Sequence, residues 1–362
     1  FDEFDDVNRK GQPSGDLGYS YSKPAIAMLD NGQWAVIFGN GYNSDSGKAV
    51  LYIAYIMEGT NGWQVSDFKK LDTGVGNSSS KNGLSSPTVV DIDEDGKADK
   101  VYAGDLQGNL WVFDIKGNRG KWKTSKLFSA ERSAKQQAIT SAPVVVNNTA
   151  TSGSEPNLMV LFGTGQYITH DDLSDNSGQT IYGIGDNCTK NLTRSDLESR
   201  AFSLNIEGDR EISGDAIDWT FDNGWYADLD NGSAASGYAG ERAVTKPLFW
   251  LGDVFFTTLL PSSNICSGGG SSWLLGLDAL TGLPSSEAAY DFNNDGVLDD
   301  QDLGKVGDKK DSIIITPPAV NKDDFVITAG TDSDGVVLDE SNLKDVGKQQ
   351  IGRFGWKEVI PQ

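Results

Sequence analysis

The sequence predicts an all-β fold, a modified β-propeller of about seven blades or part of one, with inserted loops and a short helical insertion. Two observations support this prediction. Short apolar runs alternate with turn residues along the chain, and one run-and-turn unit recurs five times. Glycine contributes 43 of the 362 residues and aromatic residues 10%, which favours many short strands. A pair of β-sandwiches is the alternative fold, and the fivefold recurrence favours the propeller.

Each recurring unit opens on a proline and continues as strand, turn and strand. The first unit reads YSYSKPAIAM, then an Asn31-Gly32 turn, then WAVIFGNGYNS and AVLYIAYI. Proline suits the first position of an innermost strand, where its missing N–H costs no ladder hydrogen bond. The five openings are marked by Pro24, Pro87, Pro143, Pro247 and Pro318.

One long segment, residues 187–240, departs from the recurring unit. We interpret it as an insertion within a single propeller domain that spans residues 1–362. It contains LTRSDLESR, where Thr193 or Ser195 would cap a helix with Asp196 and Glu198 in its first turn.

The charge of the chain restricts its partners. The formal net charge is −22 and the sequence pI is near 4.3, so the chain should repel nucleic acid and anionic lipid and attract divalent cations. No run approaches the roughly 20 apolar residues of a membrane span. The chain opens FDEFDDVNRK, without a signal-peptide pattern. Either the protein is cytosolic or this chain is an excised piece of a longer exported protein. We expect the second, because it fits better with the cysteines and the calcium motifs described below.

Residues 91–99, DIDEDGKAD, predict a calcium loop. Calcium binds six to eight oxygen atoms, and carboxylates at alternate positions of a tight loop can surround it, with Gly96 supplying the sharp turn. The expected ligands are Asp91, Asp93, Asp95, the backbone carbonyl of Lys97, and Asp99. An EF hand would need an acidic residue where Tyr102 stands, and strand-like sequence follows. The loop should therefore enter a β-hairpin; the alternative is a solvated acidic turn.

A second calcium motif, DFNNDGVLDDQD, occupies residues 291–302. Its oxygen-bearing residues fill the ligand positions of a twelve-residue calcium loop. The expected ligands are Asp291, Asn293, Asp295, the backbone carbonyl of Val297, Asp299 and Asp302. Aspartate at the last position is shorter than the usual glutamate and would bind through one oxygen. An Asn/Asp-rich turn is the alternative.

The residues that could support catalysis are few. Cys188 and Cys266 have no CxxC partner, so a disulfide between them in an oxidising compartment is favoured over free thiols. The single histidine, His170, lies in a polar loop, and no nucleophile stands beside a plausible base. The sequence therefore predicts no enzyme active site. Trp111, Phe113 and Trp273 alternate with apolar neighbours and are expected in the core.

Several of these blocks together resemble the C-terminal domain of PilY-type proteins of type IV pili. The blocks are YSYSKP, WAVIFGNGYNS, SSPTVVDIDEDGKADKVYAGDLQGNLWVFDI, LFGTGQYI and GRFGWKEV. The resemblance implies a modified β-propeller with a calcium loop in one blade, at the C-terminal end of an exported protein. The family's calcium ligands fall on Asp91, Asp93, Asp95, the Lys97 carbonyl and Asp99. In the terminal motif, Gly355 and Lys357 replace the family's serine and second arginine.

The same resemblance implies a role in pilus biogenesis, twitching motility and adhesion, with influence on pilus extension against retraction. The implied partners are minor pilins and the pilus tip, together with host or abiotic surfaces. The implied location is the cell surface, the outer membrane or the pilus tip, reached through the periplasm.

Two alternatives from other classes remain open. LDALTG, at residues 277–282, resembles the repeat turn of pyrroloquinoline quinone dehydrogenases, which are also propellers. Against an enzyme, the sequence has no vicinal cysteine pair and no clear tryptophan to stack on a cofactor. A generic calcium-stabilised adhesion propeller, similar to those with FG-GAP repeats, would carry calcium loops in several successive blades.

Overall fold

The computed structural model describes most of the chain. The described residues are 15–57, 67–151, 157–206, 208–230, 238–262, 270–288, 290–292, 297–310, 314–320, 325–332 and 335–342. They form two compact units: residues 15–145 with 188–192, and residues 146–187 with the described residues from 193 to 342.

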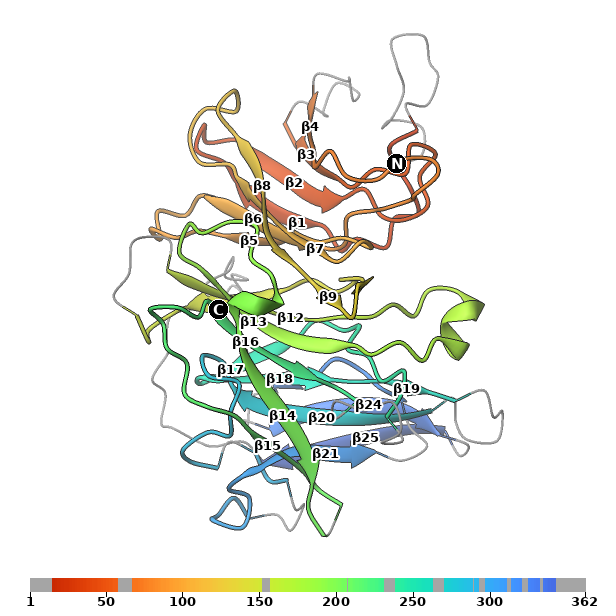
Figure 1. Cartoon of the computed structure of the whole chain (residues 1–362). Helices are drawn as coiled ribbons and strands as arrows, with labels where there is room; N and C mark the ends of the chain where they lie inside the picture. The colour runs from red at the N-terminus through yellow and green to blue at the C-terminus, as the bar shows by residue number, and fades with distance from the viewer. Residues whose placement is uncertain are drawn as a thin grey trace. The chain divides into compact units, whose positions relative to one another are not determined.

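Two four-stranded antiparallel sheets build the first unit (Figure 1). In both sheets each strand pairs with the next strand along the chain, as in a propeller blade. The first sheet contains β1 (Ala25–Met28), β2 (Trp34–Gly39), β3 (Val50–Tyr55) and β4 (Phe68–Asp72). The second contains β5 (Thr88–Val90), β6 (Lys100–Gly104), β7 (Asn109–Asp114) and β8 (Lys123–Ser129). A short hairpin follows, of β9 (Glu131–Arg132) and β10 (Lys135–Gln136).

The core of the first unit joins these two sheets. Ile37 and Ile53 of the first sheet belong to one buried cluster with Val101 and Phe113 of the second. Burying an aliphatic or aromatic side chain of this size contributes roughly 1.5–3 kcal/mol, so the packing of sheet against sheet stabilises the unit. Trp111 is in the same cluster, which confirms that Trp111 and Phe113 are core residues.

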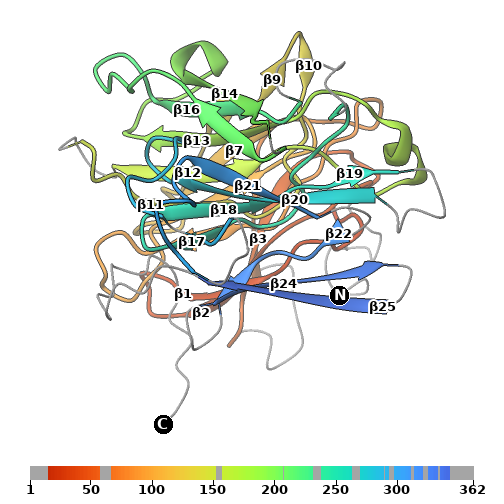
Figure 2. The same cartoon turned by 90° about the horizontal axis from the view of Figure 1, so that it is seen from below.

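The second unit starts within β11 and contains two more four-stranded groups and a final sheet. The first group is β11 (Val144–Asn147), β12 (Leu158–Gly163), β13 (Thr180–Asp186) and β16 (Gly224–Asp228). The next is β17 (Leu248–Trp250), β18 (Asp253–Thr257), β20 (Gly270–Asp278) and β21 (Lys305–Lys310), with β19 (Leu260–Pro261) also paired to β20. In the final sheet β24 (Phe325–Asp332) pairs with β22 (Ile314–Ile315), β23 (Ala319–Val320) and β25 (Gly335–Asn342), and β24 and β25 run side by side in Figure 2.

The five prolines stand where the sequence places them. Each is the residue immediately before a strand: β1, β5, β11, β17 and β23 in turn. Each of these strands is at one end of the strand order of its group, so the missing N–H costs no ladder hydrogen bond. The all-β fold class and its blade-like sheets are confirmed.

The predicted helix in the insertion is wrong beyond one turn. The capping residues do close a turn, with the Thr193 N–H donating to Asp196 Oδ2 at 2.8 Å, and the 3₁₀ helix η4 covers Arg194–Asp196. The chain then becomes β14 (Glu198–Leu204), which forms a hairpin with β15 (Arg210–Ser213). Pairing with neighbouring strands overrides the local helical signal. A further 3₁₀ helix, η3, covers His170–Ser174.

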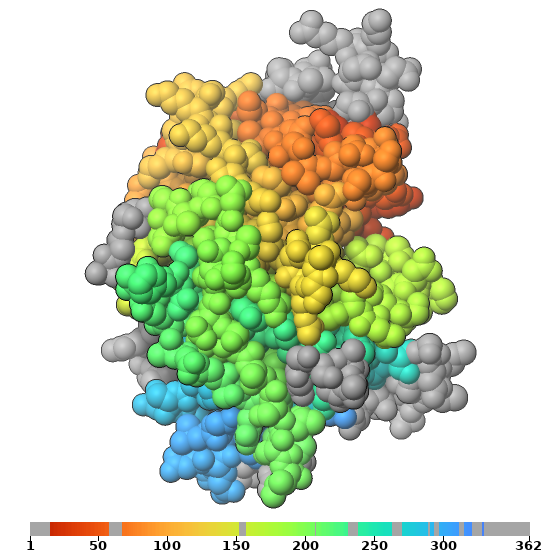
Figure 3. All heavy atoms as spheres, viewed as in Figure 1, coloured from red at the N-terminus to blue at the C-terminus, as the bar shows by residue number. Residues whose placement is uncertain are grey.

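The insertion hairpin links two blade-like groups into one sheet. β14 pairs in parallel with β16, and β15 pairs in antiparallel fashion with β21. Figure 3 shows the green residues of this segment at the surface of their unit. Among the described residues no helix is long and apolar enough to cross a membrane.

A buried ion pair fastens this hairpin to its unit. Arg210 donates from both terminal nitrogens to Glu241, at 2.9 and 2.8 Å, and both side chains are fully buried. The guanidinium carbon lies 4.8, 4.8 and 4.6 Å from the ring centroids of Phe202, Tyr238 and Trp273. Trp273 is therefore a core residue, as predicted, and its face contributes a cation–π contact.

Candidate metal centre

The first predicted calcium loop, residues 91–99, connects β5 to β6. Gly96 has a φ of 85°, a conformation that glycine adopts readily, and its N–H donates to Asp91 Oδ2 at 2.8 Å. Asp99 closes the other end: its Oδ2 accepts from the Ile92 N–H at 2.8 Å, and its own N–H donates to the Val90 carbonyl at 2.9 Å. The loop therefore enters a β-hairpin, as the sequence predicts.

Three of the predicted ligands converge in this loop. Carboxylate oxygens of Asp91, Asp93 and Asp99 all lie within 4.8 Å of one another. Asp91 Oδ1 is buried and makes no hydrogen bond within the described part of the chain. A buried acceptor without a partner is costly, and a hard cation prefers such oxygen ligands. The residues present therefore fit a calcium ion.

The other two predicted ligands are arranged differently. Asp95 does not belong to the converging group; its carboxylate accepts from the backbone N–H of Lys97 at 2.9 Å and from Lys97 Nζ at 2.7 Å. Lys97 Nζ also lies 3.8 Å from Asp30 Oδ1, on the turn after β1. The Asp95 and Lys97 side chains thus neutralise each other beside the group of three.

A lysine that the sequence analysis did not single out reaches into the group. Lys116 follows β7, and its Nζ lies 2.6 Å from Asp93 Oδ2 and 2.9 Å from Asp99 Oδ1. Both backbone polar groups of the adjoining Gly117 are hydrogen-bonded: its N–H donates to Asp30, and its carbonyl accepts from Trp122 Nε1. Nothing in the local sequence distinguishes Lys116 from a solvated turn lysine, so sequence reasoning could not find it.

The ionisation of these groups reflects their surroundings. Burial raises the pKa of Asp91, and the charges of Asp95 and Asp99 raise it further. The hydrogen bond from Lys116 lowers the pKa of Asp93. The same hydrogen bond and the one to Asp99 raise the pKa of the Lys116 ammonium. The loop therefore stabilises a positive charge beside Asp93 and Asp99, and in this structure the Lys116 ammonium supplies it.

The hairpin below the loop is organised by one buried carboxylate. Asp105, in the β6–β7 turn, is fully buried. Its oxygens accept from Asn82 Nδ2 at 2.9 Å, the Gln107 N–H at 2.9 Å and Trp111 Nε1 at 2.8 Å. The backbone and side-chain amides of Asn109 also donate to it. Burial raises the pKa of Asp105, whereas these donors favour its charged form.

Replacing Asp105 with asparagine should destabilise the first unit by about 2–4 kcal/mol, because the new amide N–H₂ would face donors that need an acceptor. Urea unfolding followed by tryptophan fluorescence measures the change. Asp72→Asn is the matched control, since Asp72 is exposed and its carboxylate contacts the surface lysine Lys48 and the Gly74 N–H. Equal unfolding midpoints for both variants would show that the Asp105 network contributes little.

The second predicted loop is described only in part. Asp291 and Asp302 are both 2% exposed, whereas Val297 is 55% exposed. The Asp299 N–H donates to Asp302 Oδ2 at 3.2 Å. Asn293 and Asp295 lie outside the described residues. Two buried carboxylates at the ends of the motif are compatible with a cation site, and this site stays a prediction.

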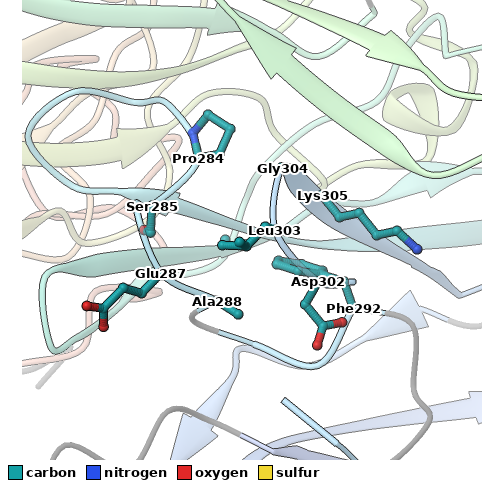
Figure 4. A pocket seen from close by; sticks show the side chains of 10 residues that line it. Pro284, Ser285, Glu287, Ala288, Phe292, Asp302, Leu303, Gly304 and Lys305 are labelled. Carbon is teal, nitrogen blue, oxygen red and sulfur yellow. The ribbon is translucent and has the colours of Figure 1, made fainter. Parts of the chain in front are cut away.

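A small pocket adjoins this second loop (Figure 4). Phe292, Asp302 and Leu303 line it with Pro284 and Ser285. Its free volume is about 10 Å³, which is room for about one water molecule. This pocket is too small for a quinone cofactor, although it lies just after the LDALTG segment.

Two further residues named in the sequence analysis belong to other segments of the chain. Cys188 is exposed and has a φ of 73°. Cys266 lies outside the described residues, so the disulfide stays a prediction. His170 begins the 3₁₀ helix η3, in the second unit.

Comparisons with known proteins agree on one family. A family model described as the PilY1 beta-propeller domain matches residues 2–205. The type IV pilus biogenesis factor PilY1 of Pseudomonas aeruginosa (strain PAK) is 35% identical over 331 residues, covering 78% of this chain and 27% of that protein. A PilY1 homolog of Xylella fastidiosa is 30% identical over 359 residues, covering 96% of this chain and 27% of that protein.

A solved structure gives the same result. The crystal structure of the Pseudomonas aeruginosa PilY1 C-terminal domain matches with a TM-score of 0.70 and 31% sequence identity, covering 90% of this chain and 73% of that one. The chain spans about a quarter of the length of the curated relatives named above. The chain therefore belongs to the PilY1 β-propeller family, as a PilY-type C-terminal domain.

Proposed function

We propose that the chain is the calcium-binding domain of a type IV pilus biogenesis and adhesion factor. The observation that carries the proposal is the convergence of Asp91, Asp93 and Asp99 in a hairpin loop of a PilY-type domain. The two relatives described above are named as type IV pilus biogenesis factors, which supports the pilus role. We propose no catalytic activity for it.

In the proposed site, Asp91, Asp93 and Asp99 hold the calcium ion directly. Asp95, which would first have to leave its ion pair with Lys97, and the Lys97 carbonyl would complete the shell. The second loop, at residues 291–302, would provide a further site. Bound calcium neutralises carboxylates that would otherwise repel one another, so it stiffens the loop and the β5–β6 hairpin that carries it. A ligand shifts an equilibrium only through its different affinities for two states. Stiffening of this surface is the difference that would bias pilus extension against retraction.

The proposed partners are minor pilins at the pilus tip, with host or abiotic surfaces as targets of attachment. The proposed location is accordingly outside the cytoplasm, at the cell surface, the outer membrane or the pilus tip. The net charge of −22 supports partners other than nucleic acid.

The proposal is tested in cells that carry the full-length protein with Asp99→Ala as the only copy. Because this change removes one of three converging carboxylates, surface piliation and twitching should lose their dependence on calcium. Asp72→Ala is the control, since it removes the same charge from the same unit at an exposed surface ion pair. Identical piliation of wild type and Asp99→Ala at low and high calcium would reduce the loop to a structural turn.

A further inference from the structure

We propose that Lys116 sets the calcium affinity of the loop, by acting as a tethered cation that calcium must displace. This inference rests on the proposed calcium site and adds a residue from outside the calcium motif. The calcium affinity depends on the free energy of the metal-free loop as well as on the ligands, and Lys116 acts on the metal-free loop.

The geometry makes the ammonium and calcium competitors for the same oxygens. Lys116 Nζ lies 2.6 Å from Asp93 Oδ2 and 2.9 Å from Asp99 Oδ1. Calcium would sit about 2.3–2.6 Å from its oxygen ligands, so an ion bound by these two carboxylates would take nearly the same place. Two cations cannot share that place, because their repulsion at such a distance is large. Calcium entry therefore requires the ammonium to leave.

The position of Lys116 is prepared by its own turn. The Gly117 N–H donates to Asp30, and Trp122 Nε1 donates to the Gly117 carbonyl at 3.3 Å. These contacts fix the backbone next to Lys116, so the ammonium is presented to the loop at a high effective concentration. The Lys116 side chain is 51% exposed, which leaves it a route into solvent when calcium arrives.

The metal-free loop therefore has an internal counter-ion. Without Lys116, Asp93 and Asp99 would repel each other and Asp91, and the loop would open more readily. With it, the loop keeps a closed form at low calcium, and a higher calcium concentration is needed for loading. Lys116 thus weakens binding and stabilises the metal-free hairpin at the same time.

The test compares Lys116→Met with Lys121→Met in the 362-residue chain by titration calorimetry with calcium chloride. Both changes remove one positive charge from the same β7–β8 connection, and Lys121 is exposed. The Lys116 variant should bind calcium about tenfold more tightly, because calcium no longer has to break the two ion pairs of Lys116. The control should bind calcium as wild type does. The Asp99→Ala variant shows which part of the calcium-binding heat comes from this loop and which part comes from other sites. Lys116→Gln serves if the methionine variant does not fold.

A second readout follows the metal-free state. In chelator, Lys116→Met should unfold at a lower temperature than wild type, and saturating calcium should remove the difference. Equal affinities for the two lysine variants, or weaker binding by Lys116→Met, would overturn the role of Lys116 and leave the calcium site intact. If the Asp99→Ala variant gives the same binding heat as wild type, the calcium site itself is overturned, and the inference with it.

Discussion

Asp99→Ala should weaken calcium binding to the first loop by at least about a hundredfold, because it removes a charged ligand from a preorganised oxygen cluster. Asp99 is 3% exposed and also holds the Ile92 N–H at 2.8 Å, so it shapes the loop as well as supplying an oxygen. Titration calorimetry on wild type and variant measures the change in affinity and stoichiometry.

Two controls separate ligand loss from unfolding. Asp99→Asn keeps the shape and one acceptor oxygen, and should lie between wild type and the alanine variant. Asp72→Ala removes a carboxylate that pairs with Lys48 at the surface, and should bind calcium as wild type does. If the alanine variant keeps the wild-type affinity and stoichiometry, Asp99 is not a calcium ligand.

Glu241→Ala should lower the free energy of unfolding of the second unit by about 3–5 kcal/mol, because it leaves the Arg210 guanidinium buried without its counter-charge. Thr258 Oγ1, which donates to Glu241 Oε1 at 2.6 Å, would lose its partner as well. Arg210 would keep its hydrogen bond to the Leu229 carbonyl and its three aromatic neighbours, which cannot neutralise it.

Chemical denaturation measures this effect. Glu211→Ala is the matched control: Glu211 follows Arg210 on β15 and is exposed, so its loss should change stability by no more than about 0.5 kcal/mol. Replacing the pair together, as Arg210→Met with Glu241→Leu, should restore much of the loss, because no unpaired charge then remains buried. Equal stability of the Glu241 and Glu211 variants would contradict a structural role for the pair.

The blades were predictable because their signals are local. A proline, an apolar run and a glycine turn lie within about ten residues of one another, and strand pairing between consecutive runs follows from that. The helix predicted in LTRSDLESR, residues 192–200, failed for the opposite reason. Its capping box formed, with Thr193 and Asp196 in contact. The residues that follow form the strand β14 because they pair with β15 and β16, and no local sequence pattern predicts that pairing.

The metal centre divides in the same way. Asp91, Asp93 and Asp99 were found because one short motif places all three in the same loop, although Asp95 of that motif pairs with Lys97 instead. Asp30 and Lys116 come from other turns, and single charged residues in turns are common on any surface. Their roles appear only when the hairpin brings Lys116 to Asp93 and Asp99, and Asp30 to Gly117.

The insertion hairpin has a consequence for solubility. The last strand of a blade presents a row of unpaired N–H and C=O groups, a template onto which a second chain can add a strand. In the second unit, β14 occupies part of that row on β16, and β15 occupies part of it on β21. A shortened loop between residues 196 and 214 would uncover both rows at once. The hairpin therefore protects the second unit against strand-to-strand aggregation with its own copies.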